Sequence, residues 1–185
     1  YLPPMTIRPI IEAPDALLKQ ISAPVTVFDD ALKTLIADMF ETMYAAPGIG
    51  LAAVQVGVAL RVVVLDLQDA GDDAGDLPEG AEPPEPVLNP RIFINPVLVN
   101  PSSEMSVYNE GCLSVPEYYA EVERPAAVTL RWQDADGAAH EEAMSGMLAT
   151  CIQHEMDHLE GILFIDHLSR LKRNMVLKKL EKARK

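Results

Sequence analysis

The chain has 185 residues, of which 49% are hydrophobic, and a formal net charge of −13. This length suits one domain with a hydrophobic core, which we expect over residues 5–185. Two cysteines are too few for a disulfide-stapled secreted fold, and no apolar stretch approaches the roughly 20 residues of a transmembrane helix. The composition therefore indicates a cytoplasmic protein with no membrane partner. Residues 1–4 precede Met5, the expected natural start, and are interpreted as an artificial extension.

The first element predicted along the chain is a helix over residues 30–46. Its leucine, isoleucine, methionine and phenylalanine residues recur at spacings of three and four, which is typical of an amphipathic helix. Asp29 or Asp30 is the expected N-cap. The helix is expected to end at Pro47 and Gly48, because this dipeptide favours a turn.

Two strands are predicted next, on either side of an unusual segment. Residues 61–67 form a β-branched run, and residues 92–99 form a second run in which Pro96 indicates an edge strand or a bend. Between them, residues 69–90 hold seven acids and five prolines but no lysine or arginine. Such a composition favours a solvated surface insertion over a functional segment.

A hairpin is predicted in the second half of the chain. Residues 118–123 and 127–133 are rich in β-branched, aromatic and alternating apolar residues, as strands are. The Asp136-Gly137 dipeptide is a strong hairpin-turn signal. A return strand is therefore expected to run to about Ala143.

A second long helix is predicted directly after the hairpin. Ser145 is the expected N-cap, the helix runs to about Glu160, and Gly161 terminates it. No internal repeat is evident. The predicted class is α+β, with short and mostly antiparallel strands around this central helix and a further helix at the C-terminus.

The central helix carries the sequence His-Glu-x-x-His. His154 and His158 are four residues apart, so they share one helix face and can bind one divalent metal ion. Glu155 projects beside them, where it can act on a water molecule without being a ligand. The pattern indicates metal-assisted hydrolysis, most simply of an amide. His140, in the hairpin, and His167, beyond the helix, are expected to be structural or exposed.

A catalytic site of this type needs a third protein ligand, and the residues alone leave its identity open. Downstream, Phe164 stands where an extended His-Glu-x-x-His pattern requires histidine, Glu181 lies in a basic stretch, and the spacing of His167 fits neither known pattern. Upstream, Cys112 follows Gly111 and offers a thiolate, which is a strong ligand for zinc or iron.

Three separated motifs resemble those of the peptide deformylase family. They are Gly-Ile-Gly-Leu-Ala-Ala-Val-Gln at 48–55, Glu-Gly-Cys-Leu-Ser at 110–114 and Gln-His-Glu-Met-Asp-His at 153–158. The resemblance covers residues 7–179, and the acidic segment at 69–90 is its clear departure. It implies a metal-dependent hydrolase that removes the formyl group from the N-terminal formyl-methionine of nascent polypeptides and releases formate.

The resemblance also implies the metal site. Cys112, His154 and His158 would hold one divalent ion, with Fe(II) expected in cells and Zn(II), Ni(II) or Co(II) in purified protein. Glu110 is expected to pair with Arg124 and to hold the cysteine loop in place. A rival interpretation as a general His-Glu-x-x-His metalloprotease lacks a clear downstream ligand. A purely structural metal site would have four protein ligands and no adjacent glutamate.

Catalytic roles follow from the same resemblance. Glu155 would take a proton from water and deliver it to the leaving amine. Gln55 and the backbone N–H of Leu113 would stabilise the developing oxyanion. Gly48 and Gly50 would let a peptide substrate pair with the chain as an added strand.

An apolar pocket for the methionine side chain is expected beside the metal. Met147, Thr150 and Cys151 precede His154 by seven, four and three residues and so share its helix face. Ile49 is expected to close the pocket from the glycine-rich loop.

The C-terminal segment differs in charge from the rest of the chain. From Arg170 to Lys185 there are eight basic residues and one acid, a net charge of +7, while the remainder carries −20 of the total of −13. Leu168, Leu171 and Met175 form a stripe that is expected to pack on the body. The resemblance favours docking of this basic helix on the ribosome over a merely solvated helix.

Overall fold

The structure is a computed structural model that describes residues 6–68, 78–82 and 85–185. The predicted insertion at 69–90 therefore lies partly outside the described residues. Most elements are short, and none of the described helices has the length and apolar character needed to cross a membrane. In chain order the elements are η1 (Ala16–Lys19), α1 (Asp30–Ala45), β1 (Gly50–Ala52), η2 (Ala53–Val56), β2 (Val62–Leu65), β3 (Arg91–Val99), β4 (Met105–Cys112), β5 (Val115–Pro125), β6 (Ala127–Gln133), β7 (Ala139–Ser145), α2 (Gly146–Leu159), η4 (Phe164–His167) and α3 (Arg170–Ala183).

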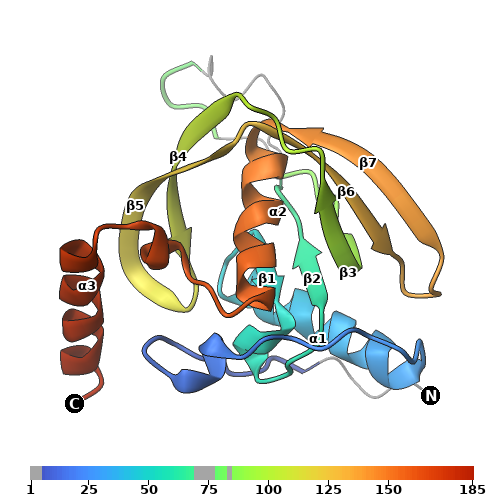
Figure 1. The fold of residues 1–185 in the computed structure, drawn as a ribbon, viewed down its shortest axis with the longest axis horizontal. Coiled ribbons are helices and arrows are strands. Elements are labelled where there is room, and N and C mark those ends of the chain that lie inside the picture. The colour runs from blue at the N-terminus through green and yellow to red at the C-terminus, as the bar shows by residue number, and fades with distance from the viewer. Residues whose placement is uncertain (1–5, 69–77, 83–84) are drawn as a thin grey trace.

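Two antiparallel sheets surround α2. The larger has the strand order β1-β2-β3-β6-β7, and the smaller is the β4–β5 hairpin. Figure 1 shows α2 standing between them, with α1 at the base and α3 on the outer side of β5. The predicted α+β class, with antiparallel strands around a central helix and a C-terminal helix, is confirmed.

The strand β2 explains how one sheet supports both α1 and α2. Successive side chains of a strand point to opposite faces. Val62 and Val64 join the core cluster that contains α1, whereas Val63 and Leu65 join the cluster that contains α2. All four side chains are buried. An unbroken β-branched run is therefore what this position requires, because both faces of the strand are covered.

The structure resolves the two open points in the first half of the chain. Asp29, not Asp30, caps α1, because its carboxylate accepts a hydrogen bond from the backbone N–H of Leu32 at 3.0 Å. The strand β3 lies inside its sheet, so Pro96 marks a bend and not an edge. The register with β6 shifts between Ile94 and Val97, which accommodates the missing N–H of the proline.

The boundaries of α2 agree closely with the prediction. Ser145 occupies the N-cap position in extended backbone, although its side chain makes no capping hydrogen bond. Gly161 has a φ of +72° just beyond the helix, where a left-handed residue is needed to end it and glycine adopts that conformation without strain. The helix α2 therefore begins directly after β7 and ends shortly before η4.

The strands β1 and β4 were not predicted, and the packing of the C-terminal segment was predicted only in part. Leu168 of the predicted stripe packs against the third core cluster, but Leu171 and Met175 are 72% and 52% exposed. Leu180 is instead the buried residue of α3, and Val176 and Leu177 pack beside it against the third core cluster. Residues 176, 177 and 180 share a helix face at spacings of one, three and four, so the face that contacts the body is rotated away from the predicted stripe.

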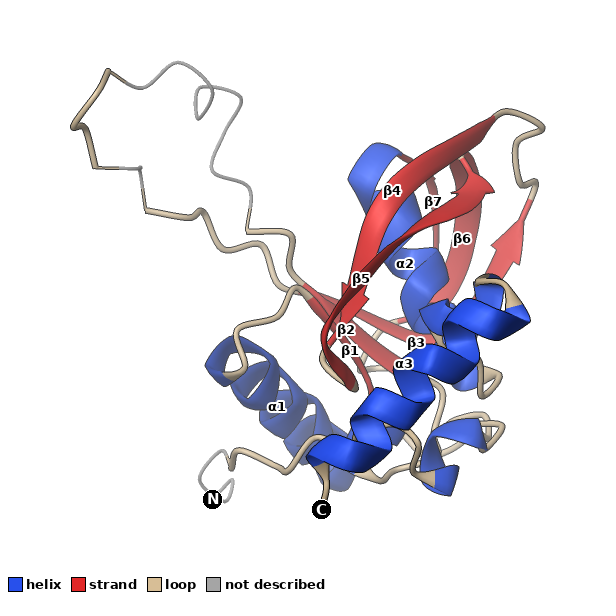
Figure 2. Cartoon of the chain, turned by 90° about the vertical axis from the view of Figure 1, so that its left-hand side faces the viewer, coloured by secondary structure: helices blue, strands red, loops and turns tan. Residues whose placement is uncertain are grey.

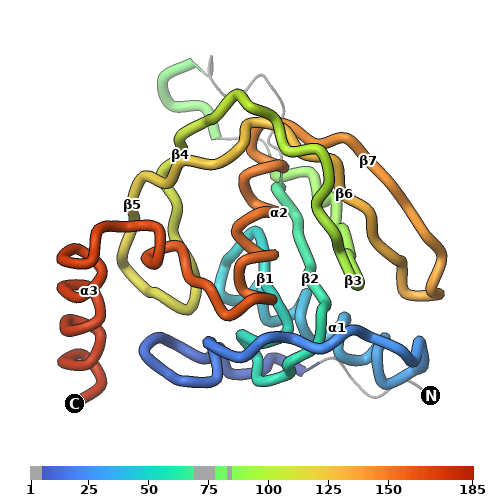
Figure 3. Tube along the Cα trace, viewed as in Figure 1, coloured from blue at the N-terminus to red at the C-terminus, as the bar shows by residue number. Residues whose placement is uncertain are grey.

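The segment before α1 fastens the base of the molecule. Figure 3 shows it running beneath β2 and α2. Its backbone N–H groups at Ile11 and Ala13 donate to the carbonyls of Gln55 and Ser114 at 2.7 and 2.8 Å. One extended stretch therefore ties η2 to the turn that follows β4, and both of these carry candidate site residues.

Candidate active site

The structure brings Cys112, His154 and His158 together although 42 residues separate the first two in the sequence. Their ligand atoms all lie within 4.8 Å of one another. Cys112 is the last residue of β4, and the two histidines project from one face of α2. Sγ of Cys112 lies 3.4 Å from Nε2 of His158.

This donor set fits a divalent metal ion. A tetrahedral ion with bonds of about 2.0–2.3 Å places its ligand atoms roughly 3.5 Å apart, close to the observed sulfur–nitrogen distance. One thiolate and two imidazoles suit Zn(II), Fe(II), Co(II) or Ni(II) and disfavour calcium or magnesium. Three protein ligands leave a fourth position for water or substrate.

A buried carboxylate orients the first histidine. Nδ1 of His154 lies 2.9 Å from Oε1 of Glu110, which leaves Nε2 for the metal. Arg124 donates two hydrogen bonds to Glu110 at 2.7 and 2.9 Å, so the predicted pair is confirmed. Arg124 also donates to Asp157 at 2.8 Å. Burial acts to raise the pKa of Glu110, but the hydrogen bonds from Arg124 and His154 hold it below its ordinary value.

The electrostatics of the histidines favour a cation between them and the cysteine. Although burial acts to lower it, hydrogen bonds to Cys112 and Glu110 raise the pKa of His154 to about 10. Burial lowers the pKa of His158 well below its ordinary value, so this imidazole is neutral, as a metal ligand must be. The cluster thus combines a neutral imidazole with groups that attract positive charge.

Glu155 lies next to the ligands but belongs to no metal-binding group found among the described residues. Burial raises its pKa to about 7, with the charge of His154 opposing the rise. A carboxyl group with a pKa near neutrality is suited to taking and giving a proton. Its Oε2 is buried and has no hydrogen-bond partner in the described part of the chain. That oxygen is therefore available to a water molecule or a substrate.

The amide of Gln55 is oriented by two neighbours. Its Oε1 accepts from the backbone N–H of Ala52 at 2.9 Å, and its Nε2 donates to Oγ of Ser114 at 3.0 Å. The same Nε2 lies 3.6 Å from Sγ of Cys112. Leu113 directly follows Cys112 and is the first residue of the turn after β4. The side-chain amide of Gln55, one of the two predicted oxyanion donors, thus lies beside the cysteine sulfur, and the residue that carries the other donor follows that cysteine.

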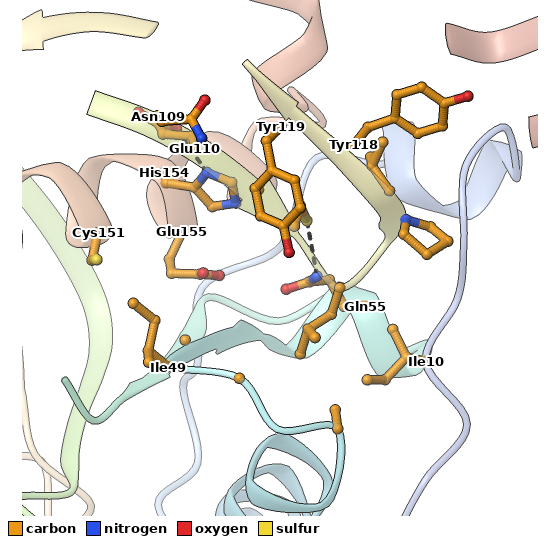
Figure 4. Close-up of a pocket in the computed structure, with 18 of the residues that line it drawn as sticks. Ile10, Ile49, Gln55, Asn109, Glu110, Tyr118, Tyr119, Cys151, His154 and Glu155 are labelled. Atoms are coloured by element: carbon orange, nitrogen blue, oxygen red, sulfur yellow. Dashed lines mark hydrogen bonds and ion pairs between the residues drawn. The ribbon is translucent and has the colours of Figure 1, made fainter. Parts of the chain in front are cut away.

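A cavity of about 660 Å³ opens in front of these groups. Figure 4 shows Glu155 and His154 projecting from α2 into it, with Ile49 facing them and Tyr119 reaching in from β5. Met147 is 46% exposed at its rim. All twelve predicted site residues except the fully buried His158 line this cavity. They are Gly48, Ile49, Gly50, Gln55, Cys112, Leu113, Met147, Thr150, Cys151, His154 and Glu155.

The strand β1 forms one edge of the cavity, and two glycines, Gly50 in the strand and Gly48 just before it, permit close packing there. A Cβ atom on Gly50 would lie 2.6 Å from Oε1 of Glu155, and one on Gly48 would lie 2.7 Å from Cδ1 of Leu113. Among the described strands β1 pairs only with β2, so its other edge is open. An open strand edge beside a catalytic group can bind an extended peptide.

A buried hydrogen-bond cluster holds this edge in place. The backbone N–H of Asp66 donates to the carbonyl of Ile49 at 2.8 Å. The carboxylate of Asp66 accepts from Tyr44 at 2.5 Å and from the backbone N–H groups of Gln68 and Asn89 at 3.0 and 3.1 Å. Burial, and then the hydrogen bond to Asp66, raise the pKa of Tyr44 to about 12. Both ends of the segment between β2 and β3 are therefore fastened beside β1.

Sequence reasoning missed four supporting residues: Ser114, Tyr119, Asp66 and Asp157. Ser114 lies inside a recognised motif, and its position two residues after Cys112 was the available signal. Asp157 lies inside another motif and is bonded to Arg124 and to Nε2 of His167. That contact and the contact of His140 with Asp134 at 2.8 Å give these two histidines structural partners, as predicted.

Comparison with known proteins places these features in a family. Residues 7–174 match the sequence model of the family described as polypeptide deformylase. The chain is 67% identical to a peptide deformylase of Novosphingobium aromaticivorans, a match that covers 98% of this chain and 99% of the relative. It is 51% identical to one of Brucella suis over 96% and 94% of the two chains.

Solved structures with a similar fold are also peptide deformylases. A peptide deformylase from Legionella pneumophila superposes with a TM-score of 0.81 at 43% identity, over 97% of this chain and 96% of that chain. One from Ehrlichia chaffeensis in complex with actinonin superposes with a TM-score of 0.85 at 38% identity, over 97% and 98%.

Proposed function

We infer the roles of the individual residues from one premise: this chain belongs to the peptide deformylase family. The protein is accordingly a metal-dependent hydrolase that removes the formyl group from the N-terminal formyl-methionine of nascent polypeptides. The observation that carries the residue assignment is the meeting of Cys112, His154 and His158 beside Glu155 in one cavity.

We assign Cys112, His154 and His158 as the ligands of the metal ion. The bound ion supplies Lewis acidity, which lowers the pKa of water and polarises the formyl carbonyl. The ion in cells is proposed to be Fe(II), with Zn(II), Ni(II) or Co(II) accepted in purified protein, because a thiolate–imidazole set suits all four. Glu110 and Arg124 support the site by fixing the ring of His154.

Glu155 is the proposed proton carrier. Its unpartnered Oε2 takes the proton of the attacking water and delivers it to the nitrogen that leaves with the peptide. Nε2 of Gln55 and the backbone N–H of Leu113 donate to the oxygen that becomes negative during the attack. Because Ala52 and Ser114 already fix the Gln55 amide, little reorganisation is needed when that charge develops.

The peptide is proposed to lie along the open edge of β1. Gly50 brings the backbone of this strand against Glu155, and Gly48, just before the strand, brings it against Leu113 in the turn after β4. The methionine side chain enters the part of the cavity lined by Ile49, Met147, Thr150 and Cys151. This wall is mostly apolar, so an unbranched apolar side chain is favoured and a charged one is excluded.

The general metalloprotease is the less favoured alternative. It requires a third ligand downstream of His158. Two observations speak against this alternative. Cys112, which is upstream, lies within ligand distance of both histidines, and Nε2 of His167 is bonded to Asp157.

Release of formate is the direct test. Formyl-Met-Ala-Ser and formyl-norleucine-Ala-Ser should be hydrolysed well, and formyl-Asp-Ala-Ser at least about 10-fold more slowly in kcat/KM. Cleavage of internal peptide bonds without release of formate would favour the protease. Equal kcat/KM for all three peptides would eliminate the proposed pocket.

Docking on the ribosome through α3 is a separate proposal. The helix carries most of the +7 charge of the C-terminal segment, and its outward side chains include Lys178 and Lys182. A cationic surface of this kind binds phosphates by releasing counterions. We further propose that the protein is cytoplasmic, where nascent chains are made. We also propose that residues 5–185 form one catalytic domain.

A further inference from the structure

A second cavity, of about 500 Å³, lies between β5 and α3. We call it the α3 groove; it is lined by Tyr118, Tyr119, Ala120 and Glu121 of β5 and by Leu168, Lys172, Met175, Val176 and Lys179. Figure 2, in which α3 faces the viewer, shows the helix alongside the β4–β5 hairpin.

The α3 groove adjoins the catalytic cavity, with strand β5 between them. Tyr118 and Tyr119 line both. Neighbouring residues of a strand point to opposite faces, and Figure 4 shows Tyr119 turned toward Glu155 while Tyr118 is turned away. Tyr119 is 70% exposed, so its ring lies at the surface where the two cavities meet.

The groove combines an apolar floor with a basic rim. Met175 is 52% exposed and offers a flexible apolar surface. Nζ of Lys179 lies over the ring of Tyr118, 5.8 Å from its centre. Lys172 precedes Lys179 by seven residues, about two helical turns, and lines the same groove. Two cations face one carboxylate, that of Glu121, although the protein as a whole is strongly acidic.

We propose that the α3 groove binds the segment of a nascent chain that follows the residues paired with β1, and that it favours acidic and apolar side chains there. This proposal rests on the proposed function, because the formyl group must already lie at Glu155. An extended peptide advances roughly 3.3 Å per residue, so a chain that leaves the catalytic cavity over Tyr119 reaches α3 within a few residues. Substrate preference would then extend beyond the methionine.

Free peptides without ribosomes test the idea. We would compare kcat/KM for formyl-Met-Ala-Ser, the same tripeptide extended by six residues that contain leucine and glutamate, and a third peptide with lysine in place of each glutamate. The glutamate extension should raise kcat/KM by about 3- to 10-fold over the tripeptide, mainly by lowering KM, and the lysine extension should not. Contacts at a solvated basic rim are of this modest size, and the advantage should shrink in salt.

Matched variants assign the effect to the groove. In the double variant Lys172→Ala with Lys179→Ala, the ratio of the glutamate peptide to the tripeptide should fall to about one. Lys178→Ala with Lys182→Ala removes the same charge from exposed positions of α3 that do not line the groove, and the ratio should persist.

Several results would overturn the proposal. They are equal kcat/KM for both extended peptides, loss of the ratio in both double variants, and a change of oligomeric mass in the Lys172 and Lys179 variant, which would make the groove a contact between copies of this chain. Absence of formate from the tripeptide would instead reject the proposed function, so the two failures are distinguishable.

Discussion

The helices α2 and α3 have the same length, 14 residues, but opposite relations to the protein. Eight side chains of α2 are buried, including both histidines and Glu155, whereas Leu180 is the one buried residue of α3. Ligands must be held to within fractions of an ångström, and this requires a helix enclosed on several sides. A helix that docks through its charge, as we propose for α3, needs only a weak attachment to the body. Two helices of equal length thus differ in how far the core encloses them.

The largest effect expected from this contrast concerns Glu155. Glu155→Ala should reduce kcat for formyl-Met-Ala-Ser by about 10²–10⁴-fold, because the proton carrier is lost. The metal content should remain near one ion per chain, since Glu155 is not among the three proposed ligands. Kinetics and elemental analysis of the same sample measure both quantities.

The same substitution in α3 provides the control. Glu181 is exposed on that helix, and Glu181→Ala should leave kcat unchanged. If Glu155→Ala lost the metal, or kept activity within a few-fold of the unchanged protein, the assignment of Glu155 would be wrong.

The buried ion pairs of Arg124 should contribute far more to the free energy of unfolding than an exposed ion pair does. Arg124 is 6% exposed and bridges Glu110 and Asp157. Arg124→Met should lower the free energy of unfolding by about 3–5 kcal/mol, because the Glu110 carboxylate stays buried without its partner. The pair of Arg131 and Glu141 is 60% and 56% exposed, so Arg131→Met should cost less than about 1 kcal/mol. Urea unfolding curves of the two variants test the difference, and similar midpoints would contradict it.

The sequence predicted the residues of α2 well because a helix has one fixed period. Spacings of three and four place His154, His158, Thr150 and Cys151 on one face without knowledge of any other element. The motif resemblance then supplied Cys112, which spacing alone left open. The long helices and the strongly β-branched β2 were predictable for the same reason, since each pattern is contained in its own segment.

The missed features depend on contacts between distant segments. The strand β1 has three residues, too few for a periodic signal, and it is a strand because Gly50, Leu51 and Ala52 pair with β2. Asp66 gains its role from Tyr44 and Asn89, which lie 22 residues before it and 23 after it. The orientation of α3 was mispredicted because several apolar faces were possible, and only the position of the core selects among them.

The two cysteines should differ sharply in their reactivity toward a thiol reagent after the metal has been removed. Cys112 is expected to resist a thiol reagent while it is a ligand and to react once a chelator has removed the ion. Cys151 should stay slow in both states, because burial, and then the charge of Glu155, raise its pKa to about 12. Mass spectrometry of labelled peptides measures each site. Equal labelling of the two cysteines with and without metal would exclude Cys112 as a ligand.

The smallest effect on catalysis is expected at the outer face of α3. Lys178, Lys182 and Arg184 are exposed and lie outside the α3 groove. Changing all three to glutamate should leave kcat/KM for formyl-Met-Ala-Ser within about two-fold, because no buried group of the site is touched. Co-sedimentation with ribosomes at low salt should fall strongly, since binding of a cationic helix to phosphates is mainly electrostatic. Glu155→Ala should show the reverse, full co-sedimentation with little turnover. If the triple variant still bound ribosomes normally, or if binding of the unchanged protein did not weaken in salt, α3 would be a solvated helix and the division of labour between the two helices would not hold.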